Sequence, residues 1–515
     1  MAKREYIAIL DYGGQYTQLI ARSVREAEVY CEILACSSEM DALVADPPAG
    51  VILSGGPNSV NEEGAPDLPP QVMELGVPIL GICYGMQLVS VAHGCELVAS
   101  ESREYGRARI KVTRPDPLFE GLPDEMEVWM SHGDSVGSLG DGMVTVAESA
   151  DCAHAAVAHT ATGFRGVQFH PEVVHTPRGK EILHNFLFRI CECRGGWKMA
   201  SFIDEAVASI QRQVGEDGKI ICGLSGGIDS SVVAVLAHKA IGDRLTCIFV
   251  DNGLLRKGER ELVERVFREN FHIKLEVVDA RDRFLDKLEG VLDPEKKRKI
   301  IGHEFIEVFR EAAERVEGAG FLAQGTLYPD VIESVSPFGG PSVTIKSHHN
   351  VGGLPEDLEF DLVEPLRYLF KDEVRKISAE LGLPDEITWR QPFPGPGLAV
   401  RIVGEITRER LKVLREADAI VYEALKESGL YREMWQGFAV MLPIQSVGVM
   451  GDGRTYENAI ALRMVSSRDG MTADWVYLPE DFTRRLSNRI INEVQGVNRV
   501  VLDISSKPPA TIEWE

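Results

Sequence analysis

The sequence lacks any uninterrupted apolar run of about 20 residues, the length that a membrane-spanning helix needs. Its first residues, MAKREYIAILDYGG, lead straight into an expected strand. They contain neither the apolar stretch nor the small-residue cleavage site of a signal peptide. We therefore expect a cytoplasmic protein with no membrane partner.

Cysteine is scarce, and no cysteine spacing is typical of a disulfide framework. The nine cysteines are spread thinly, and several lie in apolar runs such as IICGL and LTCIFV. The close pair Cys191 and Cys193 forms a CxC motif without the second pair that a structural zinc site would need. This usage predicts buried thiols in a reducing compartment.

Basic residues are outnumbered. The chain has 55 Lys and Arg against 79 Asp and Glu, a formal net charge of −24. Such a balance argues against nucleic acid as a partner, because its phosphates would be repelled overall. Any anionic substrate must then be bound by local donors.

The sequence does contain two successive patterns of short apolar strands that alternate with helices and glycine turns. Residues 1–195 and 199–390 each predict an α/β domain with a doubly wound, mostly parallel sheet. The sequence CRGGWK, residues 193–198, is typical of a linker between them. Residues 391–515 mix helices and strands and predict a smaller α+β domain.

Cys83 lies in LGICYGMQL between Gly81 and Gly85, after an apolar strand and before an expected helix. This is the thiol version of the G-x-S-x-G elbow, whose glycines permit a sharp turn that holds the nucleophile out of the sheet. Backbone N–H groups at the start of the helix favour a thiolate and a developing oxyanion. The alternative is a buried cysteine at a glycine-rich turn.

A nucleophilic cysteine needs a base, and the base needs an orienting acceptor. The sequence VQFHPEV supplies His170 at the end of another strand and Glu172 two residues later. Pro171 stiffens the turn between them, so the carboxylate could reach the imidazole N–H. Such a histidine alone is more often structural, but together with the Cys83 elbow it predicts a catalytic triad.

GxCxG followed by HPE resembles a class I glutamine amidotransferase domain, over residues 1 to about 195. The resemblance implies that Cys83 attacks the amide of glutamine, forms a glutamyl thioester and releases ammonia. His170 would act as base and acid, with Glu172 orienting it. The backbone N–H groups of Tyr84 and of Gly56, in LSGGP, would form the oxyanion hole.

The stretch GLSGGIDSSV, residues 223–232, has the glycines of a phosphate-binding loop but not the lysine of a Walker loop. Its anion must be held by backbone N–H groups, serine hydroxyls and the helix N-terminus. A carboxylate beside phosphates is repulsive unless a cation lies between them, so Asp229 is a natural Mg²⁺ ligand. The alternative is a glycine turn with Asp229 favoured by the helix dipole.

The pattern SGGxDSS resembles the pyrophosphate loop of the N-type ATP pyrophosphatases, which split ATP between the α and β phosphates. The resemblance implies that the loop holds the departing pyrophosphate, with ATP as substrate and Mg²⁺ as cofactor. The residues implied are Ser225, Gly226, Gly227, Ile228, Asp229, Ser230 and Ser231. The next strand, FVDNG, ends where an adenine would dock, and we expect contacts with the backbone of Val250.

An ammonia generator joined to an adenylating site predicts an amidoligase, in which ATP activates an oxygen of an acceptor and ammonia displaces AMP. The whole chain resembles a family of such enzymes whose acceptor is xanthosine monophosphate (XMP), activated at O2 of the base. The segments KPPATIEWE, QPFPGPGLAVR and IKSHHNVGG carry this likeness. It implies that Lys507, Ile512 and Glu513 contact the nucleotide.

A stretch rich in Gly, Pro, Ser and His, residues 334–357, is expected to be a lid that orders when ATP and acceptor are both bound. The residues expected to close over the site or to assist are Asp330, Glu333, Lys346, His348 and His349. The paired histidines could instead be a metal site, and KPP an exposed tail. The last domain resembles a dimerisation domain, so we expect a homodimer.

Other ATP pyrophosphatases fit less well. Ammonia-using NAD synthases lack the Cys–HPE domain, glutamine-type asparagine synthetases expose an N-terminal cysteine, and tRNA-thiolating relatives need a basic RNA surface. A non-catalytic nucleotide sensor is a further alternative. The intact Cys83, His170, Glu172 and Asp229 count against it.

Overall fold

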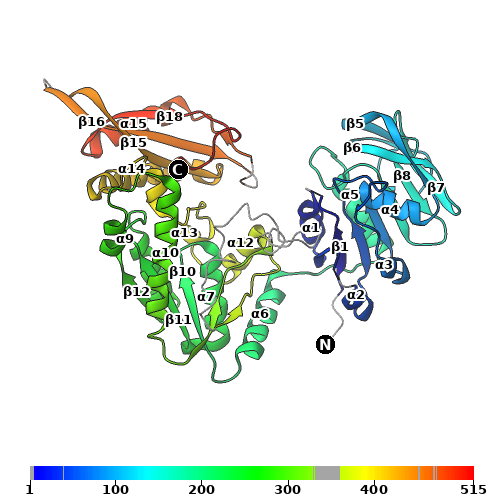
Figure 1. The fold of residues 1–515 in the computed structure, drawn as a ribbon, viewed down its shortest axis with the longest axis horizontal. Helices are drawn as coiled ribbons and strands as arrows, with labels where there is room; N and C mark the ends of the chain where they lie inside the picture. Colours follow the sequence, from blue (N-terminus) through cyan, green and yellow to red (C-terminus); the bar gives the residue numbers. More distant parts are fainter. Residues whose placement is uncertain are drawn as a thin grey trace. The chain divides into compact units, whose positions relative to one another are not determined.

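The structure, a computed structural model, divides the chain into two compact units, each with its own sheets and core (Figure 1). One unit comprises Met1–Phe202 with Leu327–Ser347, and the other Ile203–Thr326 with His348–Glu515. The described residues are 5–14, 16–38, 40–328, 330, 360–450, 453–467, 470 and 472–515.

Within its described residues, the first unit has a nine-stranded mixed sheet of order β2-β1-β3-β4-β9-β8-β7-β5-β6. The strands are β1 (Ile7–Asp11), β2 (Cys31–Ala35), β3 (Gly50–Leu53), β4 (Ile79–Ile82), β5 (Glu96–Val112), β6 (Glu125–Ser138), β7 (Met143–Ser149), β8 (Ala156–His159) and β9 (Phe164–Val167). The first five strands of this order, from β2 to β9, pair with their neighbours in parallel. The pairings from β9 through β8, β7 and β5 to β6 are antiparallel. The α/β class is confirmed, but the sheet is mixed because β7, β8 and β9 are joined by connections too short for a crossover helix.

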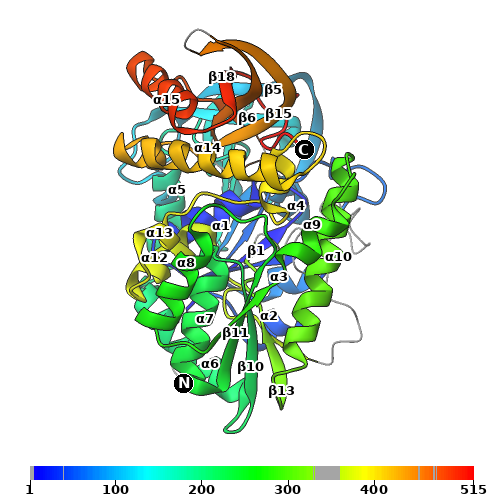
Figure 2. The same cartoon turned by 90° about the vertical axis from the view of Figure 1, so that its left-hand side faces the viewer.

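The second unit has a parallel sheet, which numbers five strands over the described part of the chain, in the order β12-β11-β10-β13-β14. The strands are β10 (Lys219–Leu224), β11 (Leu245–Asp251), β12 (Leu275–Asp279), β13 (Ala319–Ala323) and β14 (Asp361–Val363). Strand β11 is buried at every position, as a central strand covered on both faces should be. Helices α7 (Ile228–Ile241) and α10 (Pro294–Ala313) lie on opposite sides of β10 and β11 (Figure 2).

The end of the chain forms a smaller sheet backed by helices, as expected of an α+β region. Strand β16 pairs antiparallel with β15 and β17 and parallel with β18. The elements are α14 (Arg408–Glu427), β15 (Gln436–Met450), β16 (Gly453–Ser466), β17 (Asp474–Trp475), α15 (Glu480–Glu493) and β18 (Val497–Asp503). Met441, Ile460 and Leu462 pack against the two helices in a core that continues into the parallel sheet.

The remaining helices connect the strands. They include α1 (Thr17–Glu26), α2 (Asp41–Ala45), α3 (Pro70–Glu74), α4 (Tyr84–Ala92), α5 (Gly179–Asn185), α6 (Met199–Val214), α8 (Glu259–Val263), α9 (Arg281–Lys287), α12 (Lys371–Glu380) and α13 (Asp385–Thr388). No helix in the described ranges is long and apolar enough to span a membrane. All nine cysteines are free, which confirms the expectation from their spacing.

Lys297 of α10 holds the side chain of Glu515. The lysine side chain is fully buried, pairs with the Glu515 carboxylate and donates to the carbonyl of Ile402 at 2.8 Å. Lys297→Met would leave a buried carboxylate without its cation, a loss that costs about 3–5 kcal/mol. We expect a clearly lower denaturant midpoint for unfolding of the second unit, followed by intrinsic fluorescence.

Lys287→Met is the matched control for this variant. Its partner Glu304 is also buried, but Glu304 keeps a second partner in Arg283. The control should therefore lose little stability. If both variants lost the same stability to denaturant, the Lys297–Glu515 pair would contribute no more than the Lys287–Glu304 pair.

Candidate active sites

Cys83 occupies a tight turn between strand β4 and helix α4. Its φ is +51°, a left-handed conformation that a non-glycine residue rarely adopts, and its exposed fraction is 6%. A Cβ on Gly81 would lie 2.6 Å from the backbone of Met86, and one on Gly85 would lie 2.5 Å from the carbonyl oxygen of Leu53. The two glycines are therefore required for this strained elbow.

His170 and Glu172 form a buried pair beside the elbow. The distance from His170 Nδ1 to Glu172 Oε1 is 2.7 Å, and both side chains are almost wholly buried. Burial by itself would lower the pKa of His170, but the Glu172 carboxylate and a hydrogen bond with Cys83 hold it well above its ordinary value. The structure thus brings together the three residues that the sequence predicted as a triad.

The expected oxyanion residues line the same turn. Tyr84 begins helix α4, and a Cβ on Gly56 would lie 3.3 Å from its ring. Gly55, which was not predicted from the sequence, lies closer to the reacting groups. A Cβ on Gly55 would meet His170 Cε1 at 3.1 Å and Cys83 Cβ at 3.8 Å. Gly55 is therefore a second candidate for the close backbone approach.

Two glutamines that were not predicted from the sequence lie beside the cysteine. Gln168 Nε2 lies 3.6 Å from Cys83 Sγ, and Gln87 Nε2 donates to Gln168 Oε1 at 3.3 Å. A signal for both exists in the sequence. Gln87 follows Cys83 by one helical turn, and Gln168 precedes His170 by two residues of extended chain, which puts each on the side of the reactive residue.

The glycine loop joins β10 to α7 in the second unit. Gly226 has a φ of +71°, which glycine adopts without strain. Hydroxyls gather here: Ser230 Oγ accepts from Ser225 N at 3.2 Å and lies 3.0 Å from Ser225 Oγ. Ser231 is fully buried and donates to the carbonyl of Gly227 at 2.6 Å, so its hydroxyl serves the helix. Gly227 precedes Ile228, the first residue of α7.

A lysine does reach this loop, from far along the chain. Lys371, at the first position of α12, pairs with Asp229 Oδ2. Asp229 Oδ1 is buried and has no hydrogen-bond partner, so it remains able to bind a cation. No group of three or more metal-ligating side chains occurs among the described residues, so a Mg²⁺ here would need oxygens from its phosphate ligand.

The C-terminal motif is tied to the smaller sheet and is not a loose tail. Arg463, which is fully buried, donates to the carbonyls of Ile512, Thr511 and Ser505. Lys507 Nζ donates to the carbonyl of Gly470 at 2.8 Å. The motif is thus held in place by main-chain contacts.

Within that motif Glu513 lies in a charged environment and Ile512 in an apolar one. Glu513 accepts two hydrogen bonds from Arg401, at 3.0 and 2.8 Å, in a bidentate ion pair. Ile512 packs against an apolar patch of Phe438, Val440 and Ala461. A charged and an apolar contact side by side suit recognition of a nucleotide base and its polar edge.

The other expected contacts are only partly covered by the structure. Val250 is buried in the core, so its backbone alone could meet a ligand. Asp330 Oδ2 accepts from the backbone N–H of Leu327 at 3.0 Å. Glu333, Lys346, His348, His349 and the rest of the expected lid lie outside the described residues.

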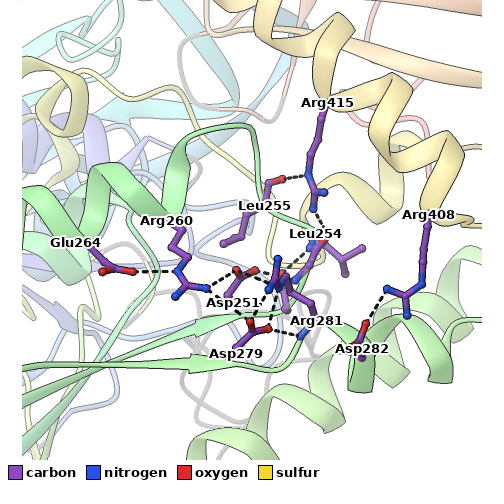
Figure 3. A network of polar contacts seen from close by, with 12 residues as sticks. Asp251, Leu254, Leu255, Arg260, Glu264, Asp279, Arg281, Asp282, Arg408 and Arg415 are labelled. Carbon is purple, nitrogen blue, oxygen red and sulfur yellow. Dashed lines mark hydrogen bonds and ion pairs between the residues drawn. The ribbon is translucent and has the colours of Figure 1, made fainter. Parts of the chain in front are cut away.

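Two neighbouring cavities of about 730 and 430 Å³ open at the carboxyl ends of β11 and β12. Their polar lining is drawn in Figure 3. Arg281 pairs with Asp279 at 2.6 Å, whereas Arg415 donates to the carbonyls of Gly253 and Leu255. Burial lowers the pKa of Arg415. The cavities lie at the edge of the sheet where nucleotides dock in such folds.

Three segments of the chain match known protein families. Residues 8–190 match the family described as glutamine amidotransferase class-I, residues 200–295 match NAD synthase, and residues 423–514 match the GMP synthase C terminal domain.

Two similar relatives extend over the whole chain. A glutamine-hydrolyzing GMP synthase of Carboxydothermus hydrogenoformans is 57% identical over 509 residues, which cover 99% of each chain. One of Solidesulfovibrio magneticus is 58% identical over 520 residues, which cover 100% of each chain. The likeness thus spans the Cys83 elbow, the glycine loop of residues 223–232 and the C-terminal motif together, and the chain belongs to the family of glutamine-hydrolysing GMP synthases, which form GMP in purine biosynthesis.

Proposed function

We propose that this enzyme divides GMP synthesis between the two sites, with Cys83, His170 and Glu172 making ammonia and the Ser225–Ser231 loop driving adenylation of XMP. Hydrolysis of glutamine would run through attack of the Cys83 sulfur on the amide carbon. The observation that carries this assignment is the buried His170–Glu172 pair bonded to Cys83 at its strained turn. A protonated His170 would supply the proton that the departing ammonia takes up.

The remaining steps of the glutaminase would use groups at the same turn. The oxyanion that forms during attack would be met by backbone N–H groups at Tyr84 and at Gly56 or Gly55. Water then hydrolyses the glutamyl thioester and releases glutamate, with His170 as the base. Gln168 would position the substrate amide beside the sulfur, because its own amide contacts Cys83 Sγ, and Gln87 would hold Gln168 in place by donating to its Oε1.

At the second site, ATP would react at its α phosphate with O2 of XMP, and the bond to the β phosphate would break. The loop N–H groups, Ser225 and Ser230 would hold the departing pyrophosphate. Lys371 would supply the cation that the loop itself lacks. Asp229 would hold Mg²⁺, which neutralises the developing phosphate charge when it is bound. Ammonia then attacks C2 of the adenylated base, and AMP leaves.

We propose that Lys507, Ile512 and Glu513 bind the XMP acceptor. The bidentate Arg401–Glu513 pair holds the carboxylate in a fixed direction, where it could accept from the base or the ribose. The apolar surroundings of Ile512 suit a base plane. The adenosine of ATP would approach the backbone of Val250 at the carboxyl end of β11.

The proposed domains are 1–195, 199–390 and 391–515, and the last would form a homodimer in a cytoplasmic enzyme. Exposed apolar side chains on the smaller sheet support an interface there. Val449 is 77% exposed and Tyr456 60% exposed, on the paired strands β15 and β16. Nine free cysteines suit a reducing compartment.

Cys83→Ala should abolish GMP formation from glutamine and leave synthesis with ammonium salts near the wild-type rate, because the sulfur is needed only to make ammonia. GMP formation with each nitrogen donor measures this. Cys152→Ala, a buried cysteine in the same unit, is the control. A folded Cys83→Ala enzyme that also failed with ammonia would refute the division of labour.

Glu172→Gln should lower the pKa of His170, because burial would then act without the opposing carboxylate. A smaller share of His170 would be protonated at neutral pH. Titration of the His170 ring by NMR gives the pKa directly, and the pH profile of basal glutaminase should move with it. Glu181→Gln, at an exposed pair with Arg178, should change neither. If the pKa of His170 were unchanged in Glu172→Gln, Glu172 would not be the residue that orients the imidazole.

Asp229→Asn should lose synthesis with either nitrogen donor and keep basal glutaminase. Loss of a charged metal ligand removes several kcal/mol of transition-state stabilisation. Pyrophosphate release at a series of Mg²⁺ concentrations measures the effect, with the exposed Asp217→Asn as control. Wild-type release at low Mg²⁺ would show that Asp229 is not a ligand.

A further inference from the structure

Arg390 joins the pyrophosphate loop to a buried carboxylate. Its Nη1 donates to the carbonyl of Gly226 at 2.6 Å, and its Nη2 pairs with Glu259 of helix α8. The two side chains are only 11% and 4% exposed. Hydrogen bonds from a guanidinium that is also paired with a carboxylate are short and directional, so the Gly226 carbonyl is firmly held.

The direction of this carbonyl decides where the loop presents its donors. The Gly226–Gly227 peptide is planar, so its C=O and its N–H point to opposite sides. Fixing the carbonyl on Arg390 therefore turns the Gly227 N–H away from Arg390, toward Ser225 Oγ, which it meets at 3.3 Å. The same bond keeps the partial negative charge of the Gly226 oxygen away from incoming phosphates.

Gly226 is also closely packed on the side of the loop that faces Arg390. A Cβ on Gly226 would lie 2.6 Å from Arg390 Nη1 and 3.5 Å from Glu259 Oε1. Glu259 is itself fixed, because its other oxygen accepts from the backbone N–H of Arg256 at 3.0 Å. On this side the loop therefore packs against the Arg390–Glu259 ion pair and is not exposed to solvent.

The arrangement continues to the C-terminal motif through one aromatic ring. The guanidinium groups of Arg256, Arg390 and Arg401 lie 5.3, 5.6 and 5.1 Å from the centre of the Phe393 ring. These are cation–π distances. Arg401 is the partner of Glu513. The residue that orients Glu513 and the residue that orients Gly226 therefore pack on the same ring.

We propose that Arg390 is a positioning residue for the adenylation step. It sets the Gly226–Gly227 peptide so that the loop offers N–H groups to the departing pyrophosphate, and it shares Phe393 with the arginine that holds the acceptor motif. The proposal rests on the function proposed above for the loop. Arg390 itself acts through the peptide and does not touch the reacting atoms.

The test compares Arg390→Met and Arg390→Lys with Arg432→Met in the full-length enzyme. Arg432 lies 4.8 Å over the Trp389 ring and pairs with Asp385 at the surface, so it is a neighbouring arginine without contact to the loop. Synthesis with ammonium chloride, XMP and Mg²⁺ is followed by pyrophosphate release over a range of ATP concentrations. Basal glutaminase reports on the first unit, and circular dichroism on the fold.

We expect kcat/KM for ATP to fall roughly 10- to 100-fold in Arg390→Met, as misplacement of a site by about 1 Å does. Arg390→Lys should recover only part of it, because lysine cannot bind the carbonyl and the carboxylate in one plane. Arg432→Met and basal glutaminase should stay near wild type. Arg390→Met with kinetics like those of Arg432→Met would overturn the proposal.

A double variant separates positioning from the unpaired charge that Arg390→Met leaves on Glu259. Glu259→Gln combined with Arg390→Met removes that charge but still provides no donor to Gly226. If Arg390 acts by positioning the peptide, kcat/KM for ATP should stay low in the double variant. Recovery of kcat/KM to the wild-type value would overturn the proposal. A wild-type enzyme that released no pyrophosphate with ATP and XMP would instead refute the proposed function of the loop.

Discussion

The second unit depends on keeping cations buried in a chain whose net charge is −24. Arg401, Arg463 and Lys297 are fully buried, and burial of an uncompensated cation would cost several kcal/mol. Each is opposed by a carboxylate: Glu513, Asp503 and Glu515 respectively.

These carboxylates are what allow the positive charges to stay in place. The overall acidic excess thus coexists with cations that are fixed locally by ion pairs. The C-terminal motif supplies two of the acids, Glu513 and Glu515, so its position is set together with the positions of Arg401 and Lys297. A change on either side of such a pair should therefore alter both the stability of the unit and the position of the C-terminal motif.

The two candidate sites share one backbone arrangement, in which a strand turns sharply into a helix. At the first site the turn places Cys83 itself at a φ of +51°, so the strain falls on the proposed nucleophile. At the second site the left-handed residue is Gly226, which bears no strain, and the anion would be met by main-chain donors. The two turns differ because a nucleophile must project its side chain, whereas a phosphate loop must expose its backbone.

Local patterns in the sequence were enough to predict which candidate site residues lie together. Cys83, His170, Glu172 and the glycine loop each lie within a few residues of a strand end, where spacing alone sets the direction of a side chain. The α/β class followed from the alternation of short apolar strands with helices. The antiparallel half of the first sheet did not, because alternation does not state which neighbour a strand pairs with.

Gly55, Gln87 and Gln168 were missed although they lie close in sequence to the predicted residues, whereas two other missed residues make contacts over long separations. Lys371 follows its partner Asp229 by 142 positions, and Arg390 follows Gly226 by 164. No short motif carries such a contact, since it is made only when helices α12 and α13 fold back against the loop. The sequence correctly indicated that a lysine was absent from the loop, and only the fold shows that one arrives from elsewhere.

The Asp229–Lys371 pair has a consequence for what the loop accepts. A phosphate group alone would meet the negative Asp229, and a divalent cation alone would meet the positive Lys371; each would have to break the ion pair without replacing both halves of it. A phosphate that arrives with its divalent cation can replace both, because the cation takes Asp229 and the phosphate takes Lys371. Since like charges a few ångströms apart repel strongly in a partly buried site, the pair favours the metal–nucleotide complex over either component. On the function proposed above for the loop, selection of magnesium-bound ATP would be a property of two side chains, Asp229 and Lys371, that the fold brings together from distant positions in the sequence.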